Sequence, residues 1–208
     1  MKDNYSKGFY KFMKVIGGWV LKLMCRPKYT NKNNLPKEGR YILAANHVSG
    51  VDPILVALGQ RRPIRFMAKK ELFENKFVKF LFSRLGTFAI DRSSKNDEAL
   101  EFSRNIIANG DALGIFIEGT RSKTNELLRP RSGAVMLAHQ TNCKIIPVSV
   151  TYRDPKKKAF TKMYITYGDP VTVEELGVKE GTPHEYRDAS RNLMARIRVT
   201  WEKDKYGN

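Results

Sequence analysis

The stretch YILAANHVSGVDP (residues 41–53) joins an apolar run to a polar loop and then to a helix start. Residues 41–45 have the length and composition of a buried strand. Asp52 followed by Pro53 is typical of a helix N-terminus, with Asp as the cap and Pro in the first turn. A strand, a loop and a helix in this order are the building unit of an α/β domain, in which functional residues follow the carboxyl ends of strands.

The rest of the chain repeats this alternation of short apolar runs and longer helical patterns. We expect an α/β fold with a mixed, largely parallel central sheet flanked by helices. Further strands are predicted at 64–68, 87–91, 112–117, 144–150 and 162–168. Helices are predicted at 71–86, from a Ser94/Asp97 capping pair through 107, at 133–140 and at 184–203.

The charge is the most unusual bulk property, because 38 Lys and Arg face 21 Asp and Glu, a formal net charge of +17. This balance predicts an anionic partner: nucleic acid, anionic lipid or a polyanionic substrate. Two cysteines and three histidines without zinc-ligand spacing indicate neither a disulfide framework nor a metal site. The sequence also contains no apolar run of transmembrane length and no signal-peptide pattern.

The N-terminal segment YSKGFYKFMKVIGGWVLKLMCRP (residues 5–27) has helical periodicity. One face is apolar and the other carries lysines, with Gly17–Gly18 as a potential kink. The apolar residues are Phe9, Phe12, Met13, Ile16, Trp19, Val20, Leu23 and Met24, and the lysines are Lys7, Lys11, Lys14 and Lys22. Such a helix suits the interfacial layer of an anionic bilayer, and the alternative is a helix packed on its own domain. We expect residues 1–30 to be a membrane-association segment and 31–208 the catalytic domain.

His47 and Asp52 have a direct chemical interpretation. A neutral imidazole can take the proton of an alcohol that attacks a carbonyl, and a carboxylate on the other ring nitrogen stabilises the resulting imidazolium. Because the substrate hydroxyl attacks, no serine or cysteine nucleophile is needed. The alternative is structural: a hydrogen-bonded His at a strand end and an Asp that caps a helix.

Three further stretches follow or lie within predicted strands. FIEGTRS (116–122) has the features of an anion site, with Gly119 for close backbone approach, Arg121 as a forked cation and Glu118 as an acceptor. GTFAIDR (86–92) places Arg92 in a similar position. The alternative for either stretch is an ordinary strand exit with a surface ion pair. IPV (146–148) puts Pro147 inside a strand pattern, which indicates an edge, a bulge or a pocket wall.

Together these four blocks resemble the glycerophospholipid acyltransferase family, most closely its lysophosphatidic acid acyltransferases. NHVSGVD, GTFAIDR, FIEGTRS and IPV stand in the family's order, and AKKEL (68–72) is similar to another family segment. The resemblance implies His47 as general base and Asp52 as its partner. It implies substrate-binding roles for Lys69, Lys70, Arg92, Glu118, Gly119, Arg121 and Pro147. Ile117 replaces the family's usual proline, so the turn into Glu118 can differ.

The resemblance further implies transfer of a fatty acyl group from acyl-CoA or acyl carrier protein to the sn-2 hydroxyl of lysophosphatidic acid. The product is phosphatidic acid, and no cofactor or metal takes part. The expected partners are the lysophospholipid, the thioester donor and an anionic membrane surface, with no nucleic acid. The expected location is peripheral, on the cytoplasmic face of the membrane. The alternatives are another acceptor, such as glycerol 3-phosphate or an acylated amino-acid lipid, and a non-catalytic protein that binds nucleic acid or membrane.

Overall fold

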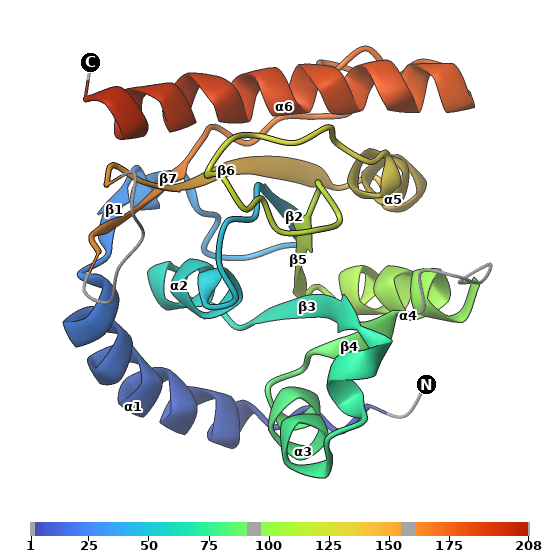
Figure 1. The fold of residues 1–208 in the computed structure, drawn as a ribbon. Coiled ribbons are helices and arrows are strands. Elements are labelled where there is room, and N and C mark those ends of the chain that lie inside the picture. Colours follow the sequence, from blue (N-terminus) through green and yellow to red (C-terminus); the bar gives the residue numbers. More distant parts are fainter. Residues whose placement is uncertain (1–2, 91–96, 155–160, 208) are drawn as a thin grey trace.

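In the computed structural model, which describes residues 3–90, 97–154 and 161–207, one seven-stranded sheet organises the chain (Figure 1). The strands stand in the order β1-β7-β6-β2-β5-β3-β4, and only the β6–β7 pair is antiparallel. The strands are β1 (Lys28–Thr30), β2 (Tyr41–Ala45), β3 (Ile64–Lys69), β4 (Phe88–Ile90), β5 (Ala112–Phe116), β6 (Lys144–Tyr152) and β7 (Met163–Tyr167). The predicted mixed, largely parallel α/β sheet is confirmed.

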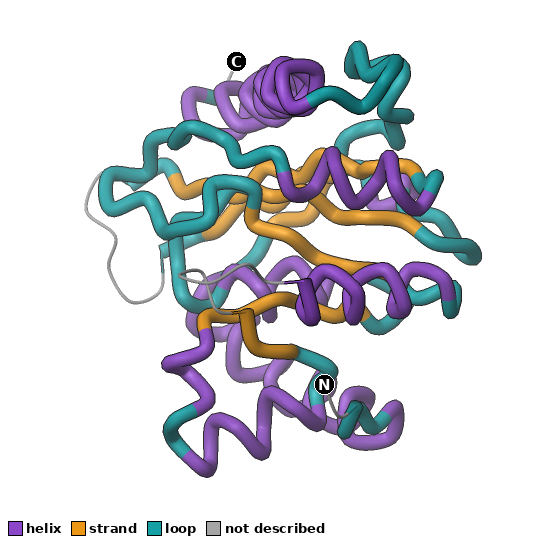
Figure 2. Tube along the Cα trace, turned by 90° about the vertical axis from the view of Figure 1, so that its right-hand side faces the viewer, coloured by secondary structure: helices purple, strands orange, loops and turns teal. Residues whose placement is uncertain are grey.

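Helices cover both faces of this sheet (Figures 1 and 2). The helices are α1 (Lys7–Cys25), α2 (Asp52–Gly59), α3 (Lys76–Arg84), α4 (Asp97–Ala108), α5 (Gly133–Thr141) and α6 (Pro183–Tyr206), with short 3₁₀ helices η1 (Lys32–Asn34) and η2 (Lys70–Phe73). Along β2, Ile42 and Ala44 join the core beneath α4, α5 and α6, whereas Tyr41 and Leu43 join the core beneath α1 and α2. A strand buried on both faces explains why the sequence of β2 is apolar throughout.

The predicted helix at 71–86 is wrong in one respect, because it is two elements. The turn η2 ends before Asn75, and the Asn75 side chain accepts hydrogen bonds from the amides of Phe77 and Val78. Asn75 therefore caps a new helix, α3, in place of continuing the first one. Helical periodicity alone did not reveal this break.

The N-terminal helix α1 is continuous through its glycine pair. A Cβ atom on Gly18 would lie 3.0 Å from Leu58 of α2, so the glycine permits close helix packing and does not kink the helix. Tyr10, Gly18 and Leu21 form the face of α1 that packs on the domain. Lys14 also points inward, because it donates a hydrogen bond to the carbonyl of Gln60.

Most of the predicted apolar face of α1 points away from the protein. Trp19 is 78% exposed and Leu23 is 72% exposed. Phe12, Ile16, Val20 and Met24 are also exposed, as is Val15. Among the described residues, α1 and the other helices are too short or too polar to cross a bilayer.

Candidate active site

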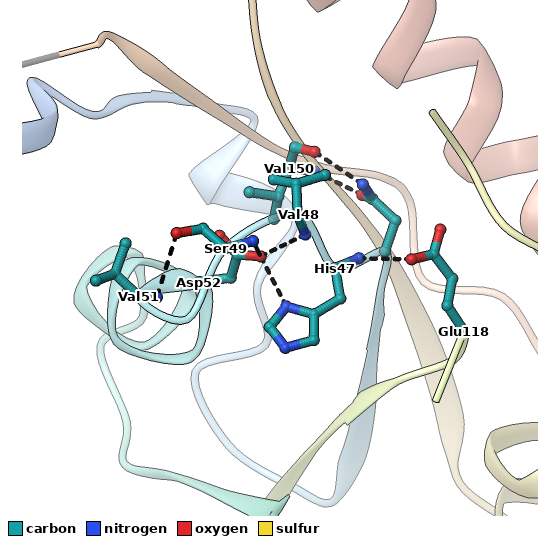
Figure 3. Close-up of polar contacts among 8 residues, drawn as sticks. His47, Val48, Ser49, Val51, Asp52, Glu118 and Val150 are labelled. Atoms are coloured by element: carbon teal, nitrogen blue, oxygen red, sulfur yellow. Dashed lines mark hydrogen bonds and ion pairs between the residues drawn. The ribbon is translucent and has the colours of Figure 1, made fainter. Parts of the chain in front are cut away.

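The candidate site begins at Asn46, which follows β2 in the middle of the sheet. The Asn46 side chain is fully buried and makes two hydrogen bonds with the backbone of Val150 in β6. Its Nδ2 donates to the carbonyl at 2.8 Å, and its Oδ1 accepts from the amide at 2.7 Å (Figure 3). This amide replaces a backbone pair just where β2 ends, so it fixes the direction in which the chain enters the loop.

Asp52 lies directly beside His47, and its Oδ2 is 2.8 Å from the imidazole Nδ1 (Figure 3). The same oxygen accepts hydrogen bonds of 2.7 Å from the amides of Val48 and Ser49. Asp52 is fully buried, whereas the His47 side chain is 17% exposed. A carboxylate only accepts, so Nδ1 carries a proton, and in the neutral imidazole Nε2, which points away from Asp52, then has the free lone pair.

The prediction that Asp52 caps helix α2 is wrong. Val51 precedes the helix, and Asp52 is already in its first turn without capping it. The carboxylate instead turns back to the loop that carries His47 and closes it. The Asp52 side chain therefore binds the imidazole and not the helix N-terminus, and a carboxylate in this position is what orients a histidine as a general base.

Glu118 fixes the backbone of His47 from the loop that follows the neighbouring strand β5. Its Oε2 accepts from the His47 amide at 3.0 Å, and its Oε1 accepts from the Leu128 amide at 2.8 Å. Burial raises the pKa of Glu118 above its ordinary value, although both amide bonds act in the opposite direction. The amide of Ser122 donates to the His47 carbonyl at 2.8 Å. Both backbone polar groups of His47 are therefore held by the FIEGTRS segment.

An aromatic stack supports the imidazole ring from below the loop. Phe116, the last residue of β5, stacks on His47 with 4.0 Å between ring centroids. Phe66 of β3 stacks in turn on Phe116 at 5.7 Å. The imidazole is thus held by a carboxylate at one edge and by an apolar wall on one ring face.

A hollow of about 490 Å³ lies next to this pair, between the loops that follow β2 and β5. It is lined by Val48, Ser49, Gly50, Thr120, Arg121, Ser122 and Lys123. Arg121 and Lys123 are both exposed. A Cβ atom on Gly50 would lie only 3.4 Å from the Arg121 guanidinium. The hollow is therefore polar and cationic, and it is suited to a phosphate group.

Gly119 is the residue that lets the second loop take this path. Its φ is +69°, a conformation that disfavours side chains, and a Cβ atom would lie 2.6 Å from Nε of Arg131. Gly119 thus serves the backbone and the packing of Arg131. The Ile117 that replaces the family's proline is buried and bonded through its amide to the carbonyl of Ala45, a bond that proline cannot make.

The remaining predicted residues lie at different distances from this centre. Lys69 and Lys70 are exposed at the carboxyl end of β3, and Lys69 pairs with Glu71 at 2.6 Å. Pro147 is buried in β6, which is an interior strand of the sheet. The antiparallel pairing shifts by one residue between the pairs Val148–Tyr167 and Ile145–Val171, so Pro147 lies at a bulge and not at an edge. Arg92 lies outside the described residues. The described residues contain no cluster of His, Cys, Asp or Glu that could hold a metal.

Sequence reasoning did not assign roles to Asn46 and Phe116, although both belong to the quoted blocks. A polar Asn at the end of an entirely apolar strand signals a buried amide that needs partners. Phe116 could not be separated from ordinary core residues, because the stack depends on the β2–β5 register that pairs Ala45 with Phe116. Lys123 was also missed, since a lysine in a loop has no distinctive pattern.

The fold and the site define an α/β domain with a histidine–carboxylate pair at the carboxyl edge of its sheet. Comparison with known proteins identifies the family to which this α/β domain belongs. The chain belongs to the acyltransferase family, whose model matches residues 26–151, more than half of the chain. It is an enzyme of the transferase class, and all four quoted blocks fall within this matched range.

Several relatives share a more specific description. The chain is 30% identical over 165 residues to the 1-acyl-sn-glycerol-3-phosphate acyltransferase of Bacillus subtilis, which covers 78% of this chain and 82% of the relative. It is 35% identical over 185 residues to the enzyme so named in Saccharomyces cerevisiae, covering 82% of this chain and 58% of the relative. The crystal structure of the 1-acyl-sn-glycerophosphate acyltransferase of Thermotoga maritima superposes with a TM-score of 0.70 at 25% identity, covering 95% of this chain and 78% of that one.

Proposed function

We propose that this protein transfers a fatty acyl group from an acyl thioester to the sn-2 hydroxyl of lysophosphatidic acid, giving phosphatidic acid for phospholipid synthesis. The printed names of the relatives in Bacillus subtilis and Saccharomyces cerevisiae support this acceptor. The single observation that carries the chemistry is the 2.8 Å contact between His47 Nδ1 and Asp52, next to a cationic hollow lined by the following residues Val48 and Ser49.

The proposed reaction needs only the side chains of the site and two substrates. Nε2 of His47 takes the proton of the acceptor hydroxyl as that oxygen attacks the thioester carbon. Asp52 stabilises the imidazolium through Nδ1. The carbon–sulfur bond then breaks, and the imidazolium returns its proton to the leaving sulfur, so that a free thiol and an ester are formed.

The hollow supports a position for the acceptor phosphate. Arg121 can bind a phosphate with two parallel hydrogen bonds, and Lys123 adds a second positive charge on the same side. Lys69, Lys70 and Arg92 are proposed as further cations for the acceptor or the donor. Glu118 and Gly119 contribute indirectly: Glu118 accepts from the His47 amide, and Gly119 allows the loop to bend.

Membrane association forms part of the proposal, because the acceptor is a lipid. Residues 1–30 would bind the bilayer surface through the exposed apolar stripe of α1, without crossing it. Trp19 and Leu23 in this stripe, with Lys11 and Lys22 exposed nearby, support contact with an anionic surface. We place the protein peripherally on the cytoplasmic face, where acyl-CoA and acyl carrier protein are found; residues 31–208 form the proposed catalytic domain.

The proposal is tested by incubating the purified protein with detergent-solubilised lysophosphatidic acid and an acyl-CoA or acyl carrier protein donor. Thiol release and phosphatidic acid should rise together. His47→Ala should lose at least about 1,000-fold of the rate while it still binds lipid vesicles. Undiminished transfer by His47→Ala would refute the assigned base, and faster turnover of glycerol 3-phosphate or another lysophospholipid would refute the assigned acceptor.

A further inference from the structure

A second cationic hollow lies far along the chain from the His47 loop, between α3 and the segment that precedes α1. Its volume is about 500 Å³. Its polar lining consists of Lys76, Lys79, Ser83 and Arg84 from α3 with Asn4 and Tyr5 from the N-terminal segment, and Phe80 provides an apolar floor. The three cations are exposed and no carboxylate is among the lining residues. The proposed acyl-transfer chemistry uses none of these side chains.

The walls of this hollow are held in place by backbone and aromatic contacts, and the Arg84 guanidinium lies over the Phe80 ring, 5.5 Å from its centroid. The Ser6 amide donates to the Arg84 carbonyl at 3.1 Å, and Phe9 packs edge-on against Phe80 with centroids 6.1 Å apart. Asp3 makes two hydrogen bonds, of 2.8 and 2.7 Å, to the largely buried Arg65. The carboxylate of Asp3, which precedes the lining residue Asn4 in the chain, is therefore already paired with a cation of its own.

Exposed apolar side chains occur on α3 and on the turn η2 that precedes it. Phe77 is 73% exposed, and Leu72 and Phe80 are about half exposed. The contact between Phe9 and Phe80 joins this surface to the exposed stripe of α1, and α1 and α3 lie together on the side of the molecule opposite α6 (Figure 1). Cations set among exposed aromatic residues match the boundary of an anionic bilayer, where phosphates lie just above acyl chains.

We propose that the α3 hollow is a binding site for the phosphate headgroup of an anionic phospholipid in the bilayer. Lys76, Lys79 and Arg84 bind the headgroup, and Phe77 enters the acyl layer beside it. The proposal rests on the proposed membrane contact of α1 but not on the chemistry of His47. The protein then contacts the membrane at two places, and the second selects lipids by charge.

The test compares binding of the full chain to vesicles of phosphatidylcholine alone and to vesicles that also contain phosphatidylglycerol. The variant Lys76→Gln/Lys79→Gln/Arg84→Gln should lose about 10- to 100-fold of its affinity for the anionic vesicles, since each cation near such a surface contributes about fivefold. Its affinity for neutral vesicles should change less than about threefold, because Phe77 and the α1 stripe remain.

A matched control removes three exposed cations from the opposite side, in Arg187→Gln/Arg196→Gln/Lys203→Gln on α6. The two triple variants lose the same net charge. A bilayer bound at the α1 and α3 side would, however, lie farther from the α6 positions than the roughly 10 Å screening length at 0.1 M salt. The control should lose less than about threefold on the anionic vesicles. Equal losses by the two triple variants, or no loss by the α3 variant, would overturn the α3 site.

Two further arms separate related outcomes. Phe77→Ser should weaken binding to both vesicle types, whereas Trp19→Ser tests the α1 contact on which the inference rests. If Trp19→Ser weakens vesicle binding but the α3 triple variant does not, only the α3 site is refuted. If Trp19→Ser has no effect on vesicle binding, the membrane contact of α1 itself is refuted. Inorganic phosphate at the same concentration as the lipid phosphate should not displace the vesicles, and full displacement would identify a soluble-anion site instead and overturn the proposal.

Discussion

The loop after β2 and the outer face of α1 reverse the usual distribution of residue types. Asn46 at the start of the loop and Asp52 in the first turn of α2 just after it are polar or charged and yet fully buried, whereas on α1 the large apolar residues Trp19 and Leu23 are exposed. Buried polar groups must be paired, and the Asn46 amide and Oδ2 of Asp52 are, through Val150, His47, Val48 and Ser49. Oδ1 of Asp52 is also buried and has no hydrogen-bond partner among the described residues. The apolar stripe of α1 has no comparable covering within the described part of the chain.

The difference shows which region is preorganised by contacts within the protein and which region needs a binding partner. The loop after β2 is preorganised, because hydrogen bonds within the protein orient the imidazole before any substrate binds. The α1 face is incomplete, because exposed apolar area of this kind marks a surface that another phase or molecule covers. Substitutions should therefore affect rate in the first region and membrane affinity in the second.

The largest effect is expected from Asp52→Asn. The amide oxygen of Asn can still accept from His47, Val48 and Ser49, so the loop keeps its shape, but the negative charge that stabilises the imidazolium is gone. We expect a loss of about 100- to 10,000-fold in the rate of acyl transfer, by analogy with other His–carboxylate pairs. Thiol release measures the rate, and thermal unfolding checks the fold. A rate within threefold of the parent would mean that the loop is only structural.

A smaller effect is expected from Trp19→Ser, which tests the other half of the comparison. Removing an exposed indole leaves folding unchanged but should weaken binding to vesicles by about 10- to 100-fold, since burial of a large apolar side chain contributes roughly 1.5–3 kcal/mol. Vesicle sedimentation measures the affinity. Val199→Ser on α6 is the matched control, because Val199 is 69% exposed on the opposite side. Similar losses in both variants would make α1 an ordinary exposed helix.

Gly119→Ala should affect stability more than Gly110→Ala, although both glycines have positive φ. At Gly110 nothing lies within 4 Å of the added Cβ, so the cost is that of the backbone conformation, about 1 kcal/mol. At Gly119 the Cβ would also collide with Arg131, which should raise the cost to about 2–3 kcal/mol. Urea unfolding of the two variants measures the difference. Equal costs would show that the FIEGTRS loop relaxes freely and does not hold His47.

The sequence predicted the elements of this fold well because their signals are local. Apolar runs marked β2, β5 and β6, and Gly86 and Gly110 ended helices where they were expected. It also brought His47 and Asp52 together correctly, since they are only five positions apart. What it could not supply was long-range: the strand order that stacks Phe116 on His47, and the direction of the α1 stripe relative to the core. Asn75 was missed because a cap inside a periodic segment resembles a solvent-exposed position.

The smallest predicted effect concerns Glu118 and depends on pH. Burial raises its pKa in the folded protein above the ordinary value of 4.5. A raised pKa means that the folded state binds the proton more tightly than the unfolded state does. The contribution of Glu118 to stability is then fully present below pH 4.5 and declines as pH rises through the folded-state pKa.

Glu118→Gln removes this titration, and therefore the difference in unfolding free energy between parent and variant isolates it. In its ionised form the parent carboxyl accepts from the amides of both His47 and Leu128, which the single amide oxygen of Gln cannot do. The difference should nevertheless be larger at about pH 4 than at about pH 7. A difference that grows toward neutral pH would show that the two amide bonds outweigh burial. Hydrogen bonding would then stabilise the ionised form of Glu118 more than burial destabilises it. The buried carboxylate beside the His47 loop would in that case cost the folded state no stability.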